Sequence, residues 1–148
     1  MTQNIDKINH IKHVLQAEGQ RFGENGEVEY LAGQVEAHRE GLKNELGYKV
    51  SWNDAVFSWY ENIYTPIRNT INAWWVKKSF PQSSDAKLIA DITDHWNGLS
   101  ASHPQLAGEI AAAHYIRRNR MSFKRRIATL FGGSSPKKDN SPNRKKAA

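Results

Sequence analysis

The stretch SWNDAVFSWYENIYTPI, residues 51–67, contains the clearest helix signals of the chain. Ser51 is followed three residues later by Asp54, which is the Ser-x-x-acid form of a capping box. Val50 and Ala55 flank this box at the spacing of a hydrophobic staple. A helix is therefore predicted to begin here, with apolar positions that recur every three or four residues. These positions are Trp52, Val56, Trp59, Tyr60 and Ile63.

The dipeptide Thr65-Pro66 interrupts this helical pattern. Proline has no amide hydrogen, so it either kinks a helix or begins a new one at its first position. The sequence leaves both possibilities open. Helical spacing resumes at Ile67 and Ile71 and is predicted to continue to about Lys78.

The rest of the chain carries further helix signals. Apolar spacing predicts one helix over 5–18 and another over about 27–46, which Gly47 is placed to end in a left-handed conformation. A capped helix is predicted over 85–99, and Pro104 can begin a last helix that runs into a basic segment. The sequence has no alternating strand pattern with hairpin turns. We therefore predict an all-α fold: a compact bundle of about five helices with a disordered basic C-terminal tail.

The charge of the 148-residue chain is distributed unevenly. Residues 116–148 hold eleven Lys or Arg against one acid, a net charge of +10. Residues 1–115 hold ten Lys or Arg against fourteen acids, a net charge of −4. Such asymmetry is typical of a protein whose basic end binds a polyanion, either nucleic acid or an anionic membrane surface.

Four segments are expected from this patterning. Residues 1–26 form an N-terminal helix and a Gly-rich joint, and residues 27–115 form a helical core domain. Residues 116–131 form a basic amphipathic helix. Residues 132–148 are predicted to be disordered, because they contain too few apolar side chains to offset the entropy lost on ordering.

The composition argues against several kinds of chemistry. The chain has no cysteine, which excludes a disulfide framework, thiolate catalysis and zinc sites of the cysteine type. It also lacks a Gly-x-Ser-x-Gly elbow, an HExxH motif and a Gly-rich loop between a strand and a helix. We therefore assign no catalytic residue, no metal ligand and no cofactor, and do not expect an enzyme. With no secretory signal pattern at the N-terminus, a cytoplasmic location is expected.

Two histidines occur in a repeated pattern, Leu-x3-(Val/Ile)-x2-His-x2-Gly-Leu, whose copies are 57 residues apart. His38 and His95 could face each other, with Asp91 or Asp94 completing a metal site or an unrecognised active site. Zinc needs three or four converging ligands, so hydrogen bonding within a helix interface is the favoured interpretation.

Aromatic residues are concentrated between Trp52 and Trp75. Beside basic residues they could stack on unpaired bases, but at helical spacing such residues more often form a core, and we favour the core. Trp74 and Trp75 are successive, so they cannot face the same way. One of them is a candidate for a partner surface, including the surface of a homodimer.

The basic end is the main functional candidate. Its cations flank an apolar row, which fits a helix along a phosphate backbone, a helix on an anionic bilayer, or a helix docked on its own domain. The runs SPKK (135–138) and SPNRKK (141–146) are similar to the Ser-Pro-basic repeats of histone tails, which favours nucleic acid over membrane. The candidate nucleic-acid-binding residues are Arg117, Arg118, Arg120, Lys124, Arg125, Arg126, Lys137, Lys138, Arg144, Lys145 and Lys146.

The central part of the chain contains several short motifs that together resemble a known domain. They are VEAHR (35–39), VSW (50–52), DAV (54–56), SWYENIYTPI (58–67), Phe80-Pro81 and His95. Over about residues 28–99 the chain resembles a helical domain of unknown function in bacterial proteins, often found beside a ParB/sulfiredoxin-like domain and labelled as a transcriptional regulator. Where that family has Gly-Arg-Thr-Glu-Ala-Asp-Leu-Tyr after Phe-Pro, this chain has QSSDAKLI (82–89). The resemblance implies a stand-alone helical regulatory module of a bacterial cytoplasm.

These observations lead to one principal prediction and one alternative. The principal prediction is a small non-enzymatic protein that binds DNA or RNA, or regulates transcription, through phosphate contacts of its basic helix and tail. The alternative is an interaction module whose basic end docks on an acidic protein, a ribosome or an anionic membrane.

Overall fold

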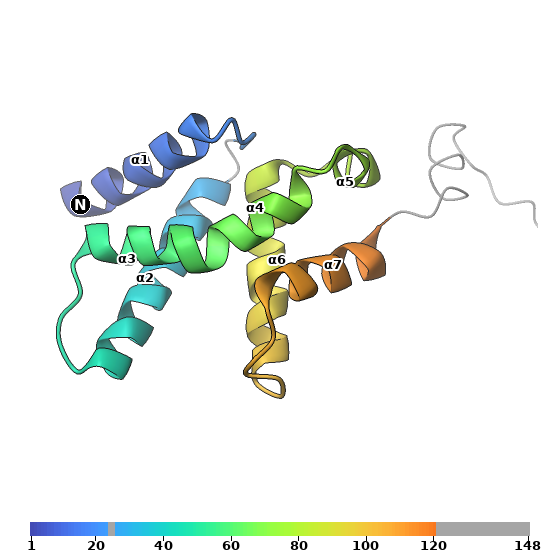
Figure 1. The fold of residues 1–148 in the computed structure, drawn as a ribbon. Helices are drawn as coiled ribbons and strands as arrows, with labels where there is room; N and C mark the ends of the chain where they lie inside the picture. Colours follow the sequence, from blue (N-terminus) through green and yellow to red (C-terminus); the bar gives the residue numbers. More distant parts are fainter. Residues whose placement is uncertain (24–25, 121–148) are drawn as a thin grey trace, which may run out of the picture.

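The computed structural model describes residues 1–23 and 26–120 (Figure 1). Within these ranges the chain forms helices, turns and loops and contains no β-strand, so the predicted all-α class is confirmed. The predicted tail and most of the predicted basic helix lie outside the described residues. The elements in chain order are α1 (Thr2–Ala17), α2 (Glu27–Leu46), α3 (Trp52–Trp59), a π-helical turn η1 (Tyr60–Tyr64), α4 (Thr65–Ile71), α5 (Trp74–Ser79), α6 (Asp85–Ser100) and α7 (Gly108–Asn119).

The helices form two groups joined by the segment that runs from α3 to α4 (Figure 1). In the first group α2 packs against α1 and α3. In the second group α4, α6 and α7 pack against one another. The groups meet where α2 contacts α6, so one core continues through both.

The predicted cap at Ser51 is present and begins α3, and the Asp54 carboxylate accepts a hydrogen bond of 2.7 Å from the Ser51 hydroxyl. The Ser51 hydroxyl accepts a hydrogen bond of 3.1 Å from the Asp54 amide, and Ser51 keeps extended dihedral angles outside the helix. At the start of α6 the Ser84 hydroxyl likewise accepts a hydrogen bond of 3.1 Å from the Lys87 amide. Each of these caps satisfies one of the amide groups that a helix leaves unpaired at its first turn.

The helical backbone continues through Pro66, which lies in the first turn of α4, and it widens into the π-turn η1 just before that helix. The Thr65 amide donates to the Tyr60 carbonyl, five residues earlier, and the Thr65 hydroxyl donates to the same oxygen at 2.8 Å. Pro66 has no amide hydrogen to donate, and Glu61 and Asn62 on the preceding turn are exposed, so water can solvate their carbonyls. A continuous helix therefore passes through the proline.

The π-turn changes which side chains enter the core. Trp59 and Tyr64 are five residues apart, yet both are fully buried and their rings stack at 5.4 Å. Tyr60 and Ile63, which helical spacing placed on the apolar face, are partly buried and pack against the core. The i→i+5 turn brings Tyr64 rather than Ile63 into the fully buried position after Trp59.

Two predicted helix boundaries are also corrected. The helix through Ile71 does not continue to Lys78, because the chain leaves helical geometry at Asn72–Ala73 and α5 begins at Trp74. The last helix begins at Gly108 rather than at Pro104. The Trp96 indole donates a hydrogen bond of 3.0 Å to the Leu106 carbonyl and holds the intervening loop against α6.

The boundary predicted between 115 and 116 does not separate two helices. Ile116 is buried in the core and lies inside α7, together with Arg117 and Arg118 in its last turn. Arg120 has extended dihedral angles, so α7 ends at Asn119. The helix that was predicted over residues 116–131 is therefore interrupted at Arg120.

Two ion pairs attach the end of α1 to the rest of the molecule. The fully buried Asp85 carboxylate accepts a hydrogen bond of 2.7 Å from the Arg21 amide, and the Arg21 side chain lies 3.3 Å from the same carboxylate. Glu18 pairs with Arg68 at 2.6 Å and accepts a hydrogen bond from the Tyr60 hydroxyl. The loop after α1 is thereby tied to α6 and to the helix that contains the π-turn.

Substituting Gly108 with alanine is expected to destabilise the fold. The added Cβ would lie 2.7 Å from the Trp96 ring and 3.0 Å from the Pro66 Cβ, so packed side chains must move, at a cost of about 1–3 kcal/mol. Gly41→Ala is the matched control, because the same methyl group there meets nothing within 4 Å on an exposed part of α2. It should raise the free energy of unfolding by about 0.5–1 kcal/mol. Urea unfolding of both variants measures the difference, and equal effects would contradict this packing argument.

Candidate functional site

Three of the predicted nucleic-acid-binding residues lie within the described part of the chain. Arg117 and Arg118 are exposed on the last turn of α7, and Arg120 is exposed just after it. Within the described residues none of the three forms an ion pair with a carboxylate. Arg117 and Arg118 lie in the last turn of α7, where the dipole of the helix stabilises positive charge. Their charges are therefore stabilised without being neutralised by a carboxylate. The remaining eight predicted residues, from Lys124 to Lys146, lie outside the described residues.

A second group of cations lies on α5, with exposed indoles beside it. Trp74 is 70% exposed and Trp75 is 43% exposed, and the Lys78 ammonium lies 5.1 Å from the centre of the Trp74 ring. The expectation that these aromatics belong to the core is therefore wrong for both tryptophans of α5. It is correct for Trp59, which is fully buried.

A ring stack joins α5 to α7. Phe80, the residue after α5, stacks on Tyr115 of α7 with ring centres 6.3 Å apart. This contact places the end of α5 beside α7, about one turn before the helix ends. We refer to the indoles and cations of α5, together with the arginines at and just after the end of α7, as the basic–aromatic surface. Its members are Trp74, Trp75, Lys77, Lys78, Arg117, Arg118 and Arg120.

His38 and His95 do not face each other; each forms a hydrogen bond to a neighbouring helix, as the favoured interpretation predicted. His95 bonds to His114 of α7, with 2.8 Å between its Nε2 and the His114 Nδ1 and with the rings stacked at 5.0 Å. His38 bonds instead to the Ser58 hydroxyl at 2.9 Å. Within residues 1–23 and 26–120 no three His, Asp or Glu side chains converge as a metal site would require.

Burial lowers the pKa of both His38 and His95. For His38 removal from water is the main cause, and the Glu45 carboxylate opposes it weakly. For His95 burial is again the largest cause, and His114 and Arg118 add positive charge in the same direction. Both side chains are therefore neutral near pH 7, and the His95–His114 contact is a bond between a ring N–H and a ring lone pair.

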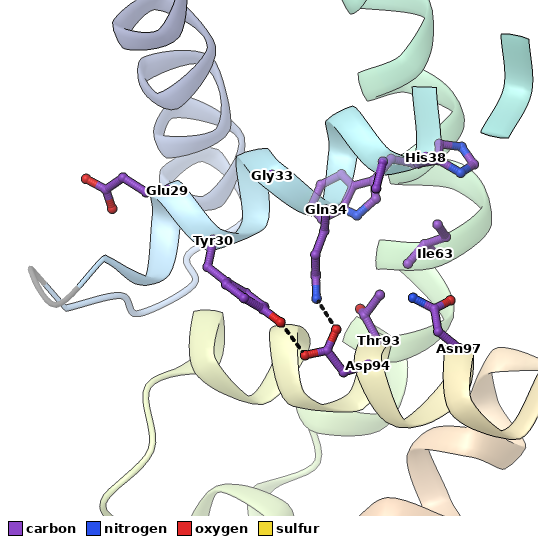
Figure 2. A pocket seen from close by; sticks show the side chains of 11 residues that line it. Glu29, Tyr30, Gly33, Gln34, His38, Ile63, Thr93, Asp94 and Asn97 are labelled. Carbon is purple, nitrogen blue, oxygen red and sulfur yellow. Dashed lines mark hydrogen bonds between the residues drawn. The ribbon is translucent and has the colours of Figure 1, made fainter. Parts of the chain in front are cut away.

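A groove with a volume of about 580 Å³ lies between α2 and α6 (Figure 2). Tyr30 and Gln34 point from α2 toward Asp94 of α6, as Figure 2 shows. The Tyr30 hydroxyl donates to one carboxylate oxygen at 2.5 Å, and the Gln34 amide donates to the other at 3.1 Å. The bond to Asp94 raises the pKa of Tyr30, and the two bonds join the helices along the groove. Thr93 and Asn97 continue the polar lining on α6.

The orientation of the Gln34 amide is fixed by its neighbours. Its nitrogen lies 3.1 Å from both the Ala90 carbonyl and the Asp94 carboxylate, which are two acceptors. Turning the amide over would bring its oxygen against both of them. The Gln34 Oε1 therefore points away from α6, and it is buried with no partner among the described residues.

The Trp59 indole is a second unpartnered group in the lining of the groove. Its side chain is fully buried, and its Nε1–H finds no acceptor in the part of the chain that the structure describes. An indole nitrogen can only donate a hydrogen bond, whereas the Gln34 oxygen can only accept one. Both unpartnered atoms belong to residues that line the groove, and both are buried beneath its surface.

The groove was not predicted from the sequence, although α2 carries a signal for it. Tyr30, Gln34 and His38 are spaced four residues apart, so they form a polar stripe along one side of an otherwise apolar helix face. The stripe does not reveal its partner, because Asp94 is 60 residues further along the chain from Gln34.

Comparisons with protein-family models, with curated proteins and with solved structures found no match to this chain. The resemblance of residues 28–99 to the helical domain of bacterial regulators therefore stays a prediction. Among residues 1–23 and 26–120, no helix combines the length and the apolar character needed to cross a membrane.

The stability of the fold is expected to fall as the pH drops from about 7.5 to about 5.5. The unfolded chain takes up protons near the ordinary histidine pKa of about 6.5, whereas His38 and His95 resist protonation in the folded state. The contribution of these two histidines to the free energy of unfolding is therefore fully present above that pKa and decreases below it. Thermal unfolding across this range should show a smaller decline for His38→Gln. The exposed His13 supplies the control His13→Gln, and an equal decline in both variants would contradict the assignment.

Proposed function

We propose that this chain is a non-enzymatic nucleic-acid-binding protein that engages single-stranded segments through its basic–aromatic surface. The observation that carries the proposal is the presence of exposed, unneutralised cations on α5 and α7 beside two exposed indoles. A regulatory role follows the resemblance of the central helices to a bacterial regulator domain.

The arginines suit contact with phosphate groups. Arg117, Arg118 and Arg120 are exposed and make no ion pair among the described residues, so binding a phosphate would not require an existing pair to break. Residues 121–148 add eight more Lys or Arg in sequence directly after them. Such contacts release counterions, which makes affinity depend strongly on salt but little on base sequence.

The indoles favour unpaired bases over a duplex. A tryptophan that is 70% exposed, as Trp74 is, leaves a large ring surface available, and the adjacent Lys78 ammonium lies over that ring. Stacking of a base on an aromatic side chain contributes about 1–3 kcal/mol and requires that the base be out of its duplex. Cations and stacking platforms on one surface are the combination found in proteins that bind single strands.

One observation supports a second candidate function, an interaction with an acidic protein. Exposed tryptophans and arginines are also the residues most enriched at the energetic centres of protein interfaces. Trp75 is also exposed on α5, on a different side of the helix from Trp74, and a second copy of this chain or an acidic partner could cover either indole. Titrations with oligonucleotides and with polyglutamate separate this candidate from nucleic-acid binding.

Neutralising two arginines should weaken binding and reduce its salt dependence. We expect Arg117→Gln/Arg118→Gln to flatten the plot of log affinity against log salt concentration by about 0.7 for each single-strand phosphate that the variant no longer neutralises. Fluorescence anisotropy of the full chain with labelled single-stranded and duplex DNA and RNA measures the slope. The charge-matched control Lys12→Gln/Lys49→Gln removes two exposed lysines from other surfaces and should leave the slope nearly unchanged.

The outcome distinguishes the two candidate functions. Equal decreases in affinity for both double variants would mean that only net charge matters and would contradict a defined surface. Binding to polyglutamate without binding to any oligonucleotide would replace nucleic acid by an acidic protein partner.

Removing the exposed indole of α5 should affect single strands selectively. Trp74→Ala is expected to cost about 1–3 kcal/mol of binding free energy for a single-stranded oligonucleotide and much less for a duplex, because paired bases cannot stack on it. The same anisotropy titration gives both values. Phe57, which is 68% exposed on α3, provides the control Phe57→Ala. A decrease in single-strand affinity that is no larger with Trp74→Ala than with this control would argue against stacking.

A further inference from the structure

The His95–His114 pair lies beside the basic–aromatic surface, at the contact between α6 and α7 (Figure 1). His114 is exposed and precedes Arg118 by four residues, so the two side chains are neighbours on one face of α7. Across the contact, the Arg118 charge is close enough to His95 to help lower the pKa of that ring. Two imidazoles and a guanidinium are therefore grouped where α7 ends.

The pair can take up one proton without breaking the bond between its rings. In the neutral pair one inner nitrogen donates and the other accepts, at a distance of 2.8 Å. The added proton occupies an outer nitrogen, either the His95 Nδ1 or the His114 Nε2, and the inner N–H···N bond is kept. The pair then carries one positive charge and an N–H donor on each outer nitrogen. A second proton would set two N–H groups against each other, so uptake stops at one.

The carboxylates of α6 near the pair have other partners. Asp91, one turn before His95, pairs with Lys87 at 2.7 Å and accepts a hydrogen bond of 3.4 Å from the Tyr115 hydroxyl. Asp94, the residue before His95, accepts its hydrogen bonds from the two α2 side chains that cross the groove. Within residues 1–23 and 26–120 the bond between the rings is the one hydrogen bond that either ring makes. The outer nitrogens are therefore available to a ligand.

The other charged neighbours are positive. On α7 they are Arg117 and Arg118, which form no ion pair among the described residues. Arg68 is the charged residue of α4, which packs against both α6 and α7, and it is paired with Glu18 at 2.6 Å. The lysines of the basic–aromatic surface belong to α5. A phosphate group held by Arg118 would bring negative charge to the pair.

We infer that the His95–His114 pair is a phosphate-binding part of the basic–aromatic surface and that it binds phosphate by taking up one proton. The His114 Nε2–H and the Arg118 guanidinium donate to oxygens of the same phosphate group, as charge-assisted hydrogen bonds. His95 acts as a positioning residue, because its bond holds the His114 ring. The inference rests on the proposed function and adds its regulation: affinity for single-stranded nucleic acid rises as the pH falls.

The direction of this pH dependence follows from thermodynamic linkage. In the free protein, burial and the positive charges of His114 and Arg118 lower the pKa of His95, so the pair is neutral near pH 7. A bound phosphate attracts the added proton and offsets the Arg118 charge, so the complex holds that proton more firmly. By reciprocity the proton strengthens phosphate binding by the same factor. The gain in affinity is fully present below the protonation midpoint of the free pair and is lost as the pH rises through the midpoint of the complex.

Fluorescence anisotropy with labelled oligo(dT) at constant salt tests the inference on the full chain. Thymine and the phosphodiester do not titrate between about pH 7.5 and about pH 5.5, so a change in affinity reports on the protein. Over this range we expect affinity to rise about three- to tenfold, the size of one partly exposed charge interaction. His114→Gln cannot take up the proton and should lose most of this rise. His13→Gln removes an exposed histidine from α1 and should keep it.

Nuclear magnetic resonance of the unmodified chain gives a readout that needs no substitution. The ring signals of His114 are followed against pH, first alone and then with saturating oligo(dT). The protonation midpoint of the pair should rise by about 0.5–1 pH unit in the complex, which is the same three- to tenfold factor seen from the side of the proton. Circular dichroism at each pH confirms that the chain stays folded, and a midpoint that oligo(dT) leaves unchanged would overturn the inference.

The outcomes separate this inference from the proposed function. Binding of oligo(dT) whose pH dependence is the same in the unmodified chain and in His114→Gln would overturn the inference and leave nucleic-acid binding in place. An equal loss of the pH dependence in His114→Gln and His13→Gln would mean that histidine charge acts from any position, and it would also overturn the inference. No binding of any oligonucleotide at any pH in this range would overturn both.

Discussion

The position of Pro66 constrains the arrangement of the whole structure. A proline inside a helix removes a hydrogen bond and clashes with the preceding turn, yet here α3 and α4 are needed as one continuous element to join the two groups of helices. The π-turn resolves this conflict by moving the hydrogen bond of Thr65 to the Tyr60 carbonyl. Trp59 and Tyr64 are brought into one buried stack as a result, and α1, α2, α6 and α7 pack around the element that contains it.

The same element links the groove between α2 and α6 to the basic–aromatic surface. At the α2 side, Trp59 lines the groove. At the other end, α4 packs against α7, whose last turn carries Arg117 and Arg118. One helix therefore lines the groove between α2 and α6 and also packs against the helix that carries two arginines of the basic–aromatic surface. Along the sequence, residues 1–115 carry a net charge of −4 and residues 116–148 a net charge of +10.

The polar contacts between α2 and α6 leave one buried polar atom unpaired among the described residues. Tyr30 and Gln34 both bind Asp94, and the second donor of the Gln34 amide binds the Ala90 carbonyl. These bonds use every donor of the amide and force its oxygen into an unpartnered position. Buried polar atoms are usually paired, so this oxygen is an exception that the contact between α2 and α6 imposes.

The sequence alone determined the features that depend on neighbouring residues: the all-α class, the caps at Ser51 and Ser84, the stop at Gly47 and the separation of charge. Each follows from contacts within a few residues, whose geometry the local chain dictates. The tertiary structure alone decided that a π-turn shifts the core face and that His95 pairs with His114. It also decided that the indoles of α5 stay exposed and that the buried Gln34 oxygen has no partner among the described residues. These outcomes depend on which distant helices meet, and periodicity within one helix contains no information about its partner.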